Sequence, residues 1–329
     1  MRVLIAGAGA MARKHIEAYR KIAGVEVAGV VNRPSPRAIS LVKEYEGFKL
    51  WESLEEAVKE SKSLILSVCV PTSLHPTLAI QGMKLGLHVV TEKPIALTLE
   101  EGLRMIEVAR QTGRKFTVVF NRRFNGVWDE VIRRLPSLGS PLVYGVQDIR
   151  SIRPKLAMHS RSGNGGPVID CAVHDFDMLL HLFGKPRRVY ASGGIFGSHK
   201  PALAQVTDLA IDTAHITVEF EQGHRACIFY GWGFPAGSTY WQSREFLGPE
   251  GILRLMGEFG EEVVHFGAGG VVETVRGLKE NGHDRILHSF VSAVRGGGEV
   301  PISGEEALEA SRIAITAIRS METGRVETL

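Results

Sequence analysis

The sequence predicts a two-domain α/β protein, in which a parallel sheet covered by helices on both faces is followed by a second α/β domain with a large mixed or antiparallel sheet. Apolar runs alternate with helical patterns through residues 1–121, and this alternation is typical of right-handed βαβ units. From residue 122 onward, strand-like runs follow one another with fewer helices between them, which favours antiparallel pairing. We therefore expect one boundary, which divides the chain into domains 1–121 and 122–329.

The elements themselves are predicted from short apolar runs bounded by turn residues. In the first domain we expect strands at 3–6, 25–31, 63–70, 88–91 and 115–120. Helical patterns follow the first three of these strands, and another helix is expected to begin at Thr98, because Glu101 completes a capping box. In the second domain we expect strands at 142–149, 188–192, 213–220 and 226–231, and a closing helix at 305–319.

Composition and charge exclude several classes of protein. The formal net charge is only +3, and the arginines form pairs rather than a long basic stripe, so no nucleic-acid partner is expected. No apolar stretch reaches the length of a membrane span. The three cysteines lie far apart without C-x-x-C spacing, which argues against a disulfide framework or a zinc knuckle and favours a cytoplasmic location.

A glycine-rich turn follows the first predicted strand. Gly7, Gly9 and Ala12 satisfy G-x-G-x-x-A between a strand and a helix, which is the context in which the motif indicates a dinucleotide site. The first glycine allows a tight turn, and the second lets the backbone approach the pyrophosphate. The N–H groups at the start of the helix, including those of Ala10 and Met11, are expected to face the phosphates. The alternative is that the glycines only form a turn.

The end of the second predicted strand bears on the choice of cofactor. An acidic residue at this position hydrogen-bonds the ribose 2′-hydroxyl in NAD-binding domains, but this chain has Asn32, followed by Arg33 and Arg37. A missing carboxylate beside two guanidiniums suits a 2′-phosphate. We therefore expect NADP to be favoured over NAD. The alternative is that both arginines are surface charges and that Asn32 serves NAD through its amide.

A lysine lies at the end of another predicted strand, in the sequence Glu92-Lys93-Pro94. The carboxyl edge of a parallel sheet is where ligands of such folds bind. A lysine at this edge can hydrogen-bond a reacting oxygen and stabilise the alkoxide that develops during hydride transfer. Taken alone, a lysine such as Lys93 is more often a surface charge.

A polar stripe is predicted on a helix of the second domain. Asp170, His174 and Asp177 are spaced i, i+4 and i+7, which places them on one face of an α-helix. Histidine exchanges protons near neutral pH, and a carboxylate one turn away can fix its tautomer. Two alternatives remain at this point: a buried structural histidine, or a metal site formed by the same side chains.

With these motifs in their order, the chain resembles the Gfo/Idh/MocA family, the group of glucose-fructose oxidoreductase and inositol dehydrogenase. The resemblance spans nearly the whole length. It rests on four motifs: Gly7-x-Gly9-x-x-Ala12-x-x-His15, Pro71-Thr72-x-x-His75, His88-Val89-Val90-Thr91-Glu92-Lys93-Pro94, and Asp170-x-x-x-His174-x-x-Asp177.

The resemblance implies a Rossmann domain, a C-terminal domain with a large open sheet that forms a dimer or tetramer, and a sugar, sugar derivative or inositol as substrate. It further implies that Lys93 binds the reacting hydroxyl, that His174 accepts its proton, that Asp170 orients substrate or His174, and that no metal takes part. The remaining residues of these motifs and the loop after the second strand are expected to contact the cofactor: Asn32, Arg33, Arg37, Pro71, Thr72, His75, Glu92 and Lys93 itself.

The chain departs from the family pattern at Asn32, where the family commonly has an acid, and at Ala172, where it commonly has glycine. A further hypothesis concerns segment 150–161, which borders the substrate in this family. Its basic residues would bind an acidic or phosphorylated substrate, the alternative being solvated loop charges. These residues are Arg150, Arg153, Lys155, His159 and Arg161.

Two other functions are compatible with this fold. One is a non-catalytic dinucleotide or sugar sensor, against which the presence of Lys93, Asp170 and His174 together argues. The other is a metal-dependent lyase or isomerase that would use the stripe of Asp170, His174 and Asp177. An oxidoreductase fits the sequence best.

Overall fold

The computed structural model describes residues 1–153, 155–235, 241–256, 262–277 and 281–329. The chain forms two compact units, the first made of Met1–Asn121 and Asn281–Leu308, the second of Arg122–Glu280 and Glu309–Leu329. The sequence predicted a single boundary after residue 121. Residues 281–308 instead fold with the first unit, because helix α8 (Gly282–Gly296) packs against helix α1 (Ala10–Arg20). No helix in the described part of the chain is both long and apolar enough to cross a bilayer.

The first unit contains a six-stranded sheet in which every strand pair is parallel. Its order, β3-β2-β1-β4-β5-β6, is that of a Rossmann fold. The strands are β1 (Arg2–Ala6), β2 (Glu26–Val31), β3 (Lys49–Trp51), β4 (Ile65–Val68), β5 (His88–Glu92) and β6 (Phe116–Val119). The prediction missed β3, since this edge strand has three residues, of which only Trp51 is buried.

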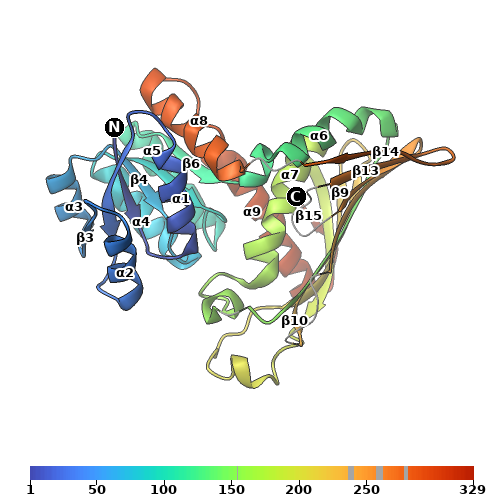
Figure 1. Ribbon diagram of the computed structural model, residues 1–329. Helices are drawn as coiled ribbons and strands as arrows, with labels where there is room; N and C mark the ends of the chain where they lie inside the picture. Colours follow the sequence, from blue (N-terminus) through green and yellow to red (C-terminus); the bar gives the residue numbers. More distant parts are fainter. Residues whose placement is uncertain (154, 236–240, 257–261, 278–280) are drawn as a thin grey trace. The chain divides into compact units, whose positions relative to one another are not determined.

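Helices connect these strands (Figure 1). They are α1, α2 (Pro36–Glu44), α3 (Leu54–Ser61), α4 (His75–Lys84) and α5 (Leu99–Thr112). Right-handed crossovers to either side of β1 distribute such helices over both faces of the sheet. The predicted helix start at Thr98 is confirmed, because the Thr98 hydroxyl accepts from the backbone N–H of Glu101 at 3.2 Å; the Glu101 carboxylate accepts from this hydroxyl at 3.1 Å.

The second unit contains a nine-stranded sheet with the order β14-β13-β12-β11-β7-β10-β9-β8-β15. Only β7 and β10 pair in parallel, so the sheet is mixed, as predicted. The strands are β7 (Val143–Ser151), β8 (Pro186–Gly194), β9 (Thr213–Phe220), β10 (Arg225–Phe234), β11 (Trp241–Gly248), β12 (Gly251–Met256), β13 (Glu262–Gly267), β14 (Gly270–Arg276) and β15 (Glu327–Thr328).

One face of this sheet is covered by helices. Phe183 of α7 (Val173–Phe183) packs edge-on against Phe220 and Phe246, and Ser320 of α9 (Gly304–Thr323) accepts from the backbone N–H of Ala191 at 2.9 Å. Alternate residues of the central strands β9 and β10 therefore point into an apolar core.

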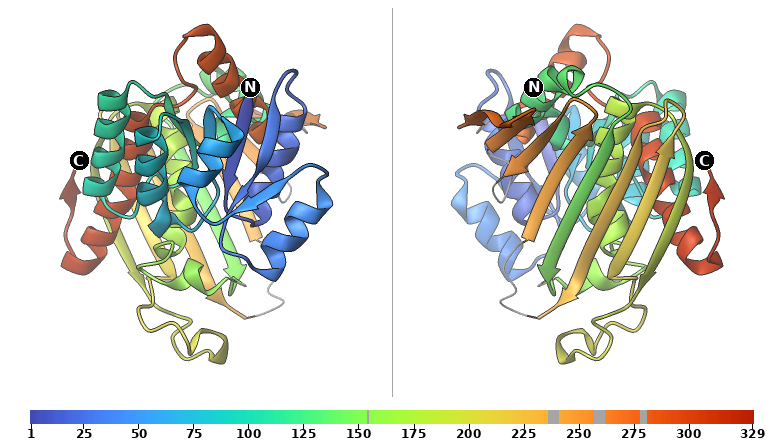
Figure 2. Two further views of the ribbon diagram at one scale, coloured as in Figure 1. Left: turned by 90° about the vertical axis from the view of Figure 1, so that its left-hand side faces the viewer. Right: turned by 90° about the vertical axis from the view of Figure 1, so that its right-hand side faces the viewer.

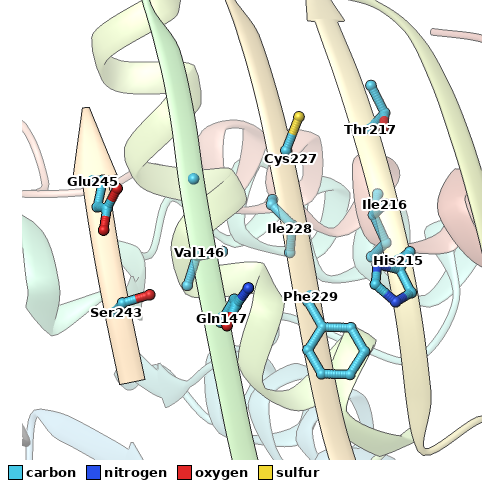
Figure 3. A pocket seen from close by; sticks show the side chains of 11 residues that line it. Val146, Gln147, His215, Ile216, Thr217, Cys227, Ile228, Phe229, Ser243 and Glu245 are labelled. Carbon is cyan, nitrogen blue, oxygen red and sulfur yellow. The ribbon is translucent and has the colours of Figure 1, made fainter. Parts of the chain in front are cut away.

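The opposite face has no helix over its central strands in Figure 2. The side chains on this face are mixed polar and apolar, and they line a shallow hollow of about 320 Å³ over β7, β9, β10 and β11 (Figure 3). Its lining includes Gln147, His215, Cys227, Phe229 and Glu245. This unit therefore has the uncovered sheet face that the family resemblance implied.

Candidate active site

The glycine turn lies where the strand order of the first unit reverses, between β1 and its neighbours β2 and β4. Gly7 has φ +106°, and a Cβ there would lie 2.5 Å from the carbonyl oxygen of Cys69. Its backbone N–H donates to Val31 at 3.0 Å. Only glycine fits this close turn, which carries the chain from the end of β1 to the start of α1.

Gly9 forms the other side of the turn and caps α1. No side chain caps this helix start, and its first turn carries no acidic residue. A Cβ at Gly9 would meet nothing within 4 Å, so the glycine borders open space rather than a packed neighbour. Uncapped N–H groups beside open space at a helix N-terminus fit an approaching pyrophosphate. Ala12 is buried in the first turn of α1, as the motif requires for close packing.

The loop after β2 carries the residues predicted to select the cofactor. The side-chain amide N–H of Asn32 donates to the backbone carbonyl of Arg33 at 2.7 Å. This hydrogen bond restrains the backbone at the start of the loop. Arg33 and Arg37 are exposed, and no described carboxylate forms an ion pair with either guanidinium. Ser35 caps α2 by accepting from the N–H of Ala38 at 3.2 Å. Two guanidiniums thus flank a helix start that lacks acidic residues.

Lys93 follows β5 directly, and the residue before it is held by a buried network. Glu92 is 6% exposed, and its Oε1 lies 2.9 Å from Nε2 of His15 and 3.6 Å from Nε2 of His283. Nδ1 of His15 lies 2.6 Å from the Ser67 hydroxyl. Glu92 is at the end of β5, His15 is on α1, and His283 is at the start of α8. Side chains from two other segments therefore fix the residue that precedes Lys93.

The charges in this network follow from its contacts. Burial lowers the pKa of His15, which is therefore neutral. Burial opposes ionisation of Glu92 as well, but the hydrogen bond from His15 and the nearby imidazole of His283 outweigh it and hold the pKa of the carboxyl well below its usual range. Since a carboxylate only accepts, His15 donates from Nε2, and its Nδ1 accepts from Ser67. Glu92 is consequently an ionised carboxylate at the end of β5, directly before Lys93 in the chain.

His75 holds the other side of the same turn. Its Nδ1 lies 2.9 Å from the carbonyl oxygen of Pro94, and its Nε2 lies 3.1 Å from that of Val70. The sequence predicted that His75 and Glu92 contact the cofactor. Both side chains are buried and their polar atoms bond to other residues of the first unit, so a contact of either residue with the cofactor stays a prediction. Both residues restrain the backbone around Lys93, and Pro71 and Thr72 begin the short helix η1 (Thr72–Leu74) before α4.

The stripe of Asp170, His174 and Asp177, for which a metal site was one alternative, is not the cluster whose geometry could hold a metal ion. In the described part of the chain, the side chains that could hold a metal ion are His15, Glu92 and His283, with ligand atoms within 4.8 Å of one another. Two imidazoles and a carboxylate form a ligand set suited to zinc or iron. The contact of 2.9 Å between His15 and Glu92 is already that of a hydrogen bond.

The catalytic residues predicted in the second unit begin at a π-helical turn. Asp170 lies in η5 (Val168–Ala172), and His174 lies in α7, which continues from it. The sequence predicted one continuous α-helix over both residues, and this was wrong. An inserted π turn changes the angular spacing of an i, i+4 pair, and such turns are frequent at functional sites. Asp170 is 6% exposed, and His174 is half-buried.

Asp177, the third member of the predicted stripe, has a structural partner. Both of its carboxylate oxygens accept from Arg123, at 2.6 and 3.0 Å. The hub of this region is Asp175, which sequence analysis did not single out. It is fully buried and accepts from Arg122 at 2.6 Å and from Tyr144 at 2.7 Å, with Arg244 at 3.1 Å and the Tyr230 hydroxyl also bound to it.

The electrostatics explain why this hub can remain buried. Burial opposes ionisation of Asp175, but Arg122 and Arg244 outweigh it and lower the pKa of the carboxyl to about 2. Arg244 also reaches Asp148 at 3.4 Å, and Asp148 binds Arg150 through both oxygens. Arg150 is thus paired with a carboxylate of its own strand, and its role as a substrate-binding cation stays a prediction. Of the other predicted cations, Lys155 is exposed, and Arg161 donates to the carbonyl of Leu209 at 3.0 Å.

Several members of these networks had no signal in the sequence. His283, Arg122 and Arg244 lie outside the motifs, and Asp175 occupies an unspecified position within the last of them; their partners come from distant segments. His15 was the exception, because it stands three residues after the glycine motif in the family pattern. A buried arginine beside a buried aspartate is recognisable only once the elements are packed.

The fold and the glycine turn define a two-domain oxidoreductase with a Rossmann dinucleotide-binding domain. Family models match both parts of the chain: residues 1–120 match the oxidoreductase family with an NAD-binding Rossmann fold, and residues 136–329 match the C-terminal α/β domain of the same family. The chain therefore belongs to the Gfo/Idh/MocA oxidoreductase family. The resemblance and the fold class predicted from the sequence are both confirmed.

Named relatives include enzymes of both cofactor types. A scyllo-inositol 2-dehydrogenase (NAD(+)) of Bacillus subtilis is 25% identical over 98% of this chain and 95% of its own length. The scyllo-inositol 2-dehydrogenase (NADP(+)) IolW of the same organism is 26% identical over 88% of this chain and 85% of its own. Among solved structures, the WlbA dehydrogenase of Bordetella pertussis in complex with NADH and UDP-GlcNAcA has a TM-score of 0.82 at 21% identity, with 100% of this chain and 97% of that chain covered.

Proposed function

We propose that this chain is an NAD(P)-dependent dehydrogenase or reductase that interconverts a hydroxyl and a keto carbon of a sugar, sugar derivative or inositol. The observation that carries the proposal is the uncapped start of α1, which borders open space at Gly9. The relatives support the substrate class, because two of them are scyllo-inositol dehydrogenases. Residues 1–121 would bind the cofactor, and residues 122–329 would bind substrate and form the oligomer contacts.

The cofactor would be held mainly by backbone and by cations. Gly7, Gly9, Ala10 and Met11 would present N–H groups to the pyrophosphate, and the loop after β2 would bind the ribose end. The nicotinamide, when bound, supplies the hydride acceptor or donor. We propose that NADP is favoured over NAD, supported by the two guanidiniums exposed in the loop that follows Asn32.

The chain's own residues would move the proton and stabilise charge. The Lys93 ammonium would donate to the reacting oxygen and stabilise it while it carries negative charge. His174 would take the hydroxyl proton during oxidation and return one during reduction. Asp170, within the π turn before α7, would orient the substrate or His174. Glu92 and His75 act through Lys93, as positioning residues.

Oligomer formation is a separate part of the proposal. The uncovered face of the nine-stranded sheet would contact a second copy of the chain and produce a dimer or tetramer, supported by Tyr190, which is 47% exposed, and by the half-buried Phe229, which lines the hollow. The cytoplasmic location expected from the cysteine pattern stays a prediction.

The test is a panel of inositols, aldoses, uronates and nucleotide sugars, each assayed with NADPH or NADP and with NADH or NAD at the nicotinamide absorbance band. Turnover of a polyol or sugar that is insensitive to chelators supports the proposal. A sensor would bind a dinucleotide without turnover, and a metal-dependent lyase would lose activity with chelator. Fluorescence titration decides the cofactor, and tighter binding of NADH than of NADPH would refute the NADP preference.

A further inference from the structure

Two imidazoles and one carboxylate converge in the interior of the first unit. His15 on α1 is fully buried, Glu92 at the end of β5 is 6% exposed, and His283 at the start of α8 is 5% exposed. One ligand atom of each residue, a ring nitrogen or a carboxylate oxygen, lies within 4.8 Å of the other two. The three residues belong to segments far apart in the chain, so the fold brings these ligand atoms together.

The distances between the ligand atoms are close to those around a single metal ion. Bonds of about 2.1 Å in a tetrahedral zinc site place neighbouring ligand atoms about 3.4 Å apart. Oε1 of Glu92 lies 2.9 Å from Nε2 of His15 and 3.6 Å from Nε2 of His283. Small shifts of these side chains would therefore admit a cation between the carboxylate and the two imidazoles.

The hydrogen bond on the far side of His15 matches that of a metal-bound imidazole. Nδ1 of His15 lies 2.6 Å from the hydroxyl of Ser67, and a hydroxyl can accept as well as donate. With a cation at Nε2, the single proton of the neutral ring would be on Nδ1, and Ser67 would accept it. Histidines that bind a metal almost always donate from their other ring nitrogen to such an acceptor, which fixes the tautomer and the orientation of the ring.

The ligand set selects a class of cation. Imidazole nitrogens with a carboxylate suit Zn²⁺ or Co²⁺, whereas Mg²⁺ prefers an octahedral shell of oxygen ligands. Three protein ligands leave the fourth position of a tetrahedral site for a water molecule. Glu92 and His283 retain slight exposure, and His15 has none. The cation and its water would therefore enter from the side of Glu92 and His283.

We propose that His15, Glu92 and His283 bind a divalent cation of the zinc type, with Ser67 as the hydrogen-bond acceptor behind His15. The cation would join α1 and α8 to the end of β5. In the metal-free protein, the hydrogen bond from His15 holds the same carboxylate. The redox reaction proposed above therefore does not need the cation, and the site is an addition to that function.

The test measures binding of Zn²⁺ and Co²⁺ to the whole metal-stripped chain without dinucleotide. Competition with a chromophoric chelator gives the Kd for Zn²⁺, and visible absorption of bound Co²⁺ reports a four-coordinate site. The wild type should bind one Zn²⁺ per chain, and a hundredfold excess of Mg²⁺ should change the Kd less than threefold. Glu92→Gln and His283→Asn should each raise the Kd at least tenfold, and Ser67→Ala should raise it about 10- to 100-fold.

The matched control is His288→Asn, because His288 is an exposed histidine on the same helix as His283. Its Kd for Zn²⁺ should equal that of the wild type. Circular dichroism checks that each variant is folded. X-ray absorption of the zinc-loaded wild type tests the site without any substitution, and it should show two imidazoles bound to the metal.

Several results would overturn the site. These are a folded wild type that binds no Zn²⁺, a metal shell without two imidazoles, Mg²⁺ that competes equally with Zn²⁺, or an unchanged Kd in both Glu92→Gln and His283→Asn. Thiolate-to-cobalt absorption bands that vanish in Cys227→Ser would place the cation at the exposed Cys227 and would also overturn it. An unchanged Kd in Ser67→Ala would contradict the role given to Ser67. Since no readout involves a dinucleotide or turnover, failure of the site would leave the proposed reaction in place.

Discussion

Replacing Glu92 with glutamine tests whether the buried network positions Lys93. The substitution keeps the shape of the side chain but removes the charge that His15 and His283 face at 2.9 and 3.6 Å. A hydrogen bond to a charged group is worth about 1.5–3 kcal/mol, so the unfolding free energy of Glu92→Gln should fall by about this amount. Urea denaturation followed by circular dichroism measures it.

The effect on turnover should exceed the effect on cofactor binding. A displacement of a catalytic group by about 1 Å costs on the order of 100-fold in rate, so kcat of Glu92→Gln should drop by roughly that factor while the Kd for NADPH changes less than about threefold. Glu92→Asp should not restore the rate, because the shorter side chain draws the carboxylate away from both imidazoles.

The control is Asp284→Asn, next to His283. Asp284 forms a solvent-accessible ion pair with Lys21 at 2.6 Å, and such pairs contribute less than about 1 kcal/mol. Its kcat and stability should stay near those of the wild type. The reasoning is refuted if Glu92→Gln keeps wild-type turnover at saturating substrate, or if its loss of rate comes entirely from weaker binding of NADPH.

Three further predictions follow from the same geometry. Gly9→Val should weaken NADPH binding at least tenfold but cost less than about 2 kcal/mol of stability, because its Cβ enters open space; equal NADPH affinity in fluorescence titration would place the pyrophosphate elsewhere. Asp175→Asn should destabilise the fold by about 3–5 kcal/mol in urea, because it removes the buried charge that the largely buried guanidiniums of Arg122 and Arg244 share; a cost below about 1 kcal/mol would contradict this. Burial lowers the pKa of His15, His75 and His159, so the unfolded chain binds protons below about pH 6.5 that the folded chain does not. The unfolding free energy should therefore fall as the pH is lowered from 7 to 5, and a flat or rising profile would show that these imidazoles are protonated in the folded state.

The first domain could be predicted from sequence because its signals are local. Each buried strand is a short apolar run, and Gly7 and Gly9 have a meaning set by their place between strand and helix. The exceptions have physical causes. Strand β3 pairs along one edge with little buried surface, and α8 reads as an ordinary amphipathic helix whose place beside α1 is decided only by packing.

The candidate site was predictable only where its residues belong to local sequence motifs. Lys93, Asp170 and His174 belong to motifs with fixed spacing, whereas Arg122 and Arg244 meet Asp175 from segments far apart in the chain. The π turn at Asp170 breaks the helical period on which the predicted stripe relied, and Asp177 turned out to have Arg123 as its partner.

The proton and charge roles of Lys93 and His174 are tested most directly by single-turnover kinetics at the nicotinamide absorbance band. Wild-type protein saturated with NADP, mixed with the substrate that the panel identifies, should show a rapid absorbance rise. Lys93→Met and His174→Asn should each slow this rise by at least about 100-fold, with the Kd for NADPH within about threefold of the wild type. A rise at the wild-type rate in either variant would remove that residue from the reaction and contradict the account.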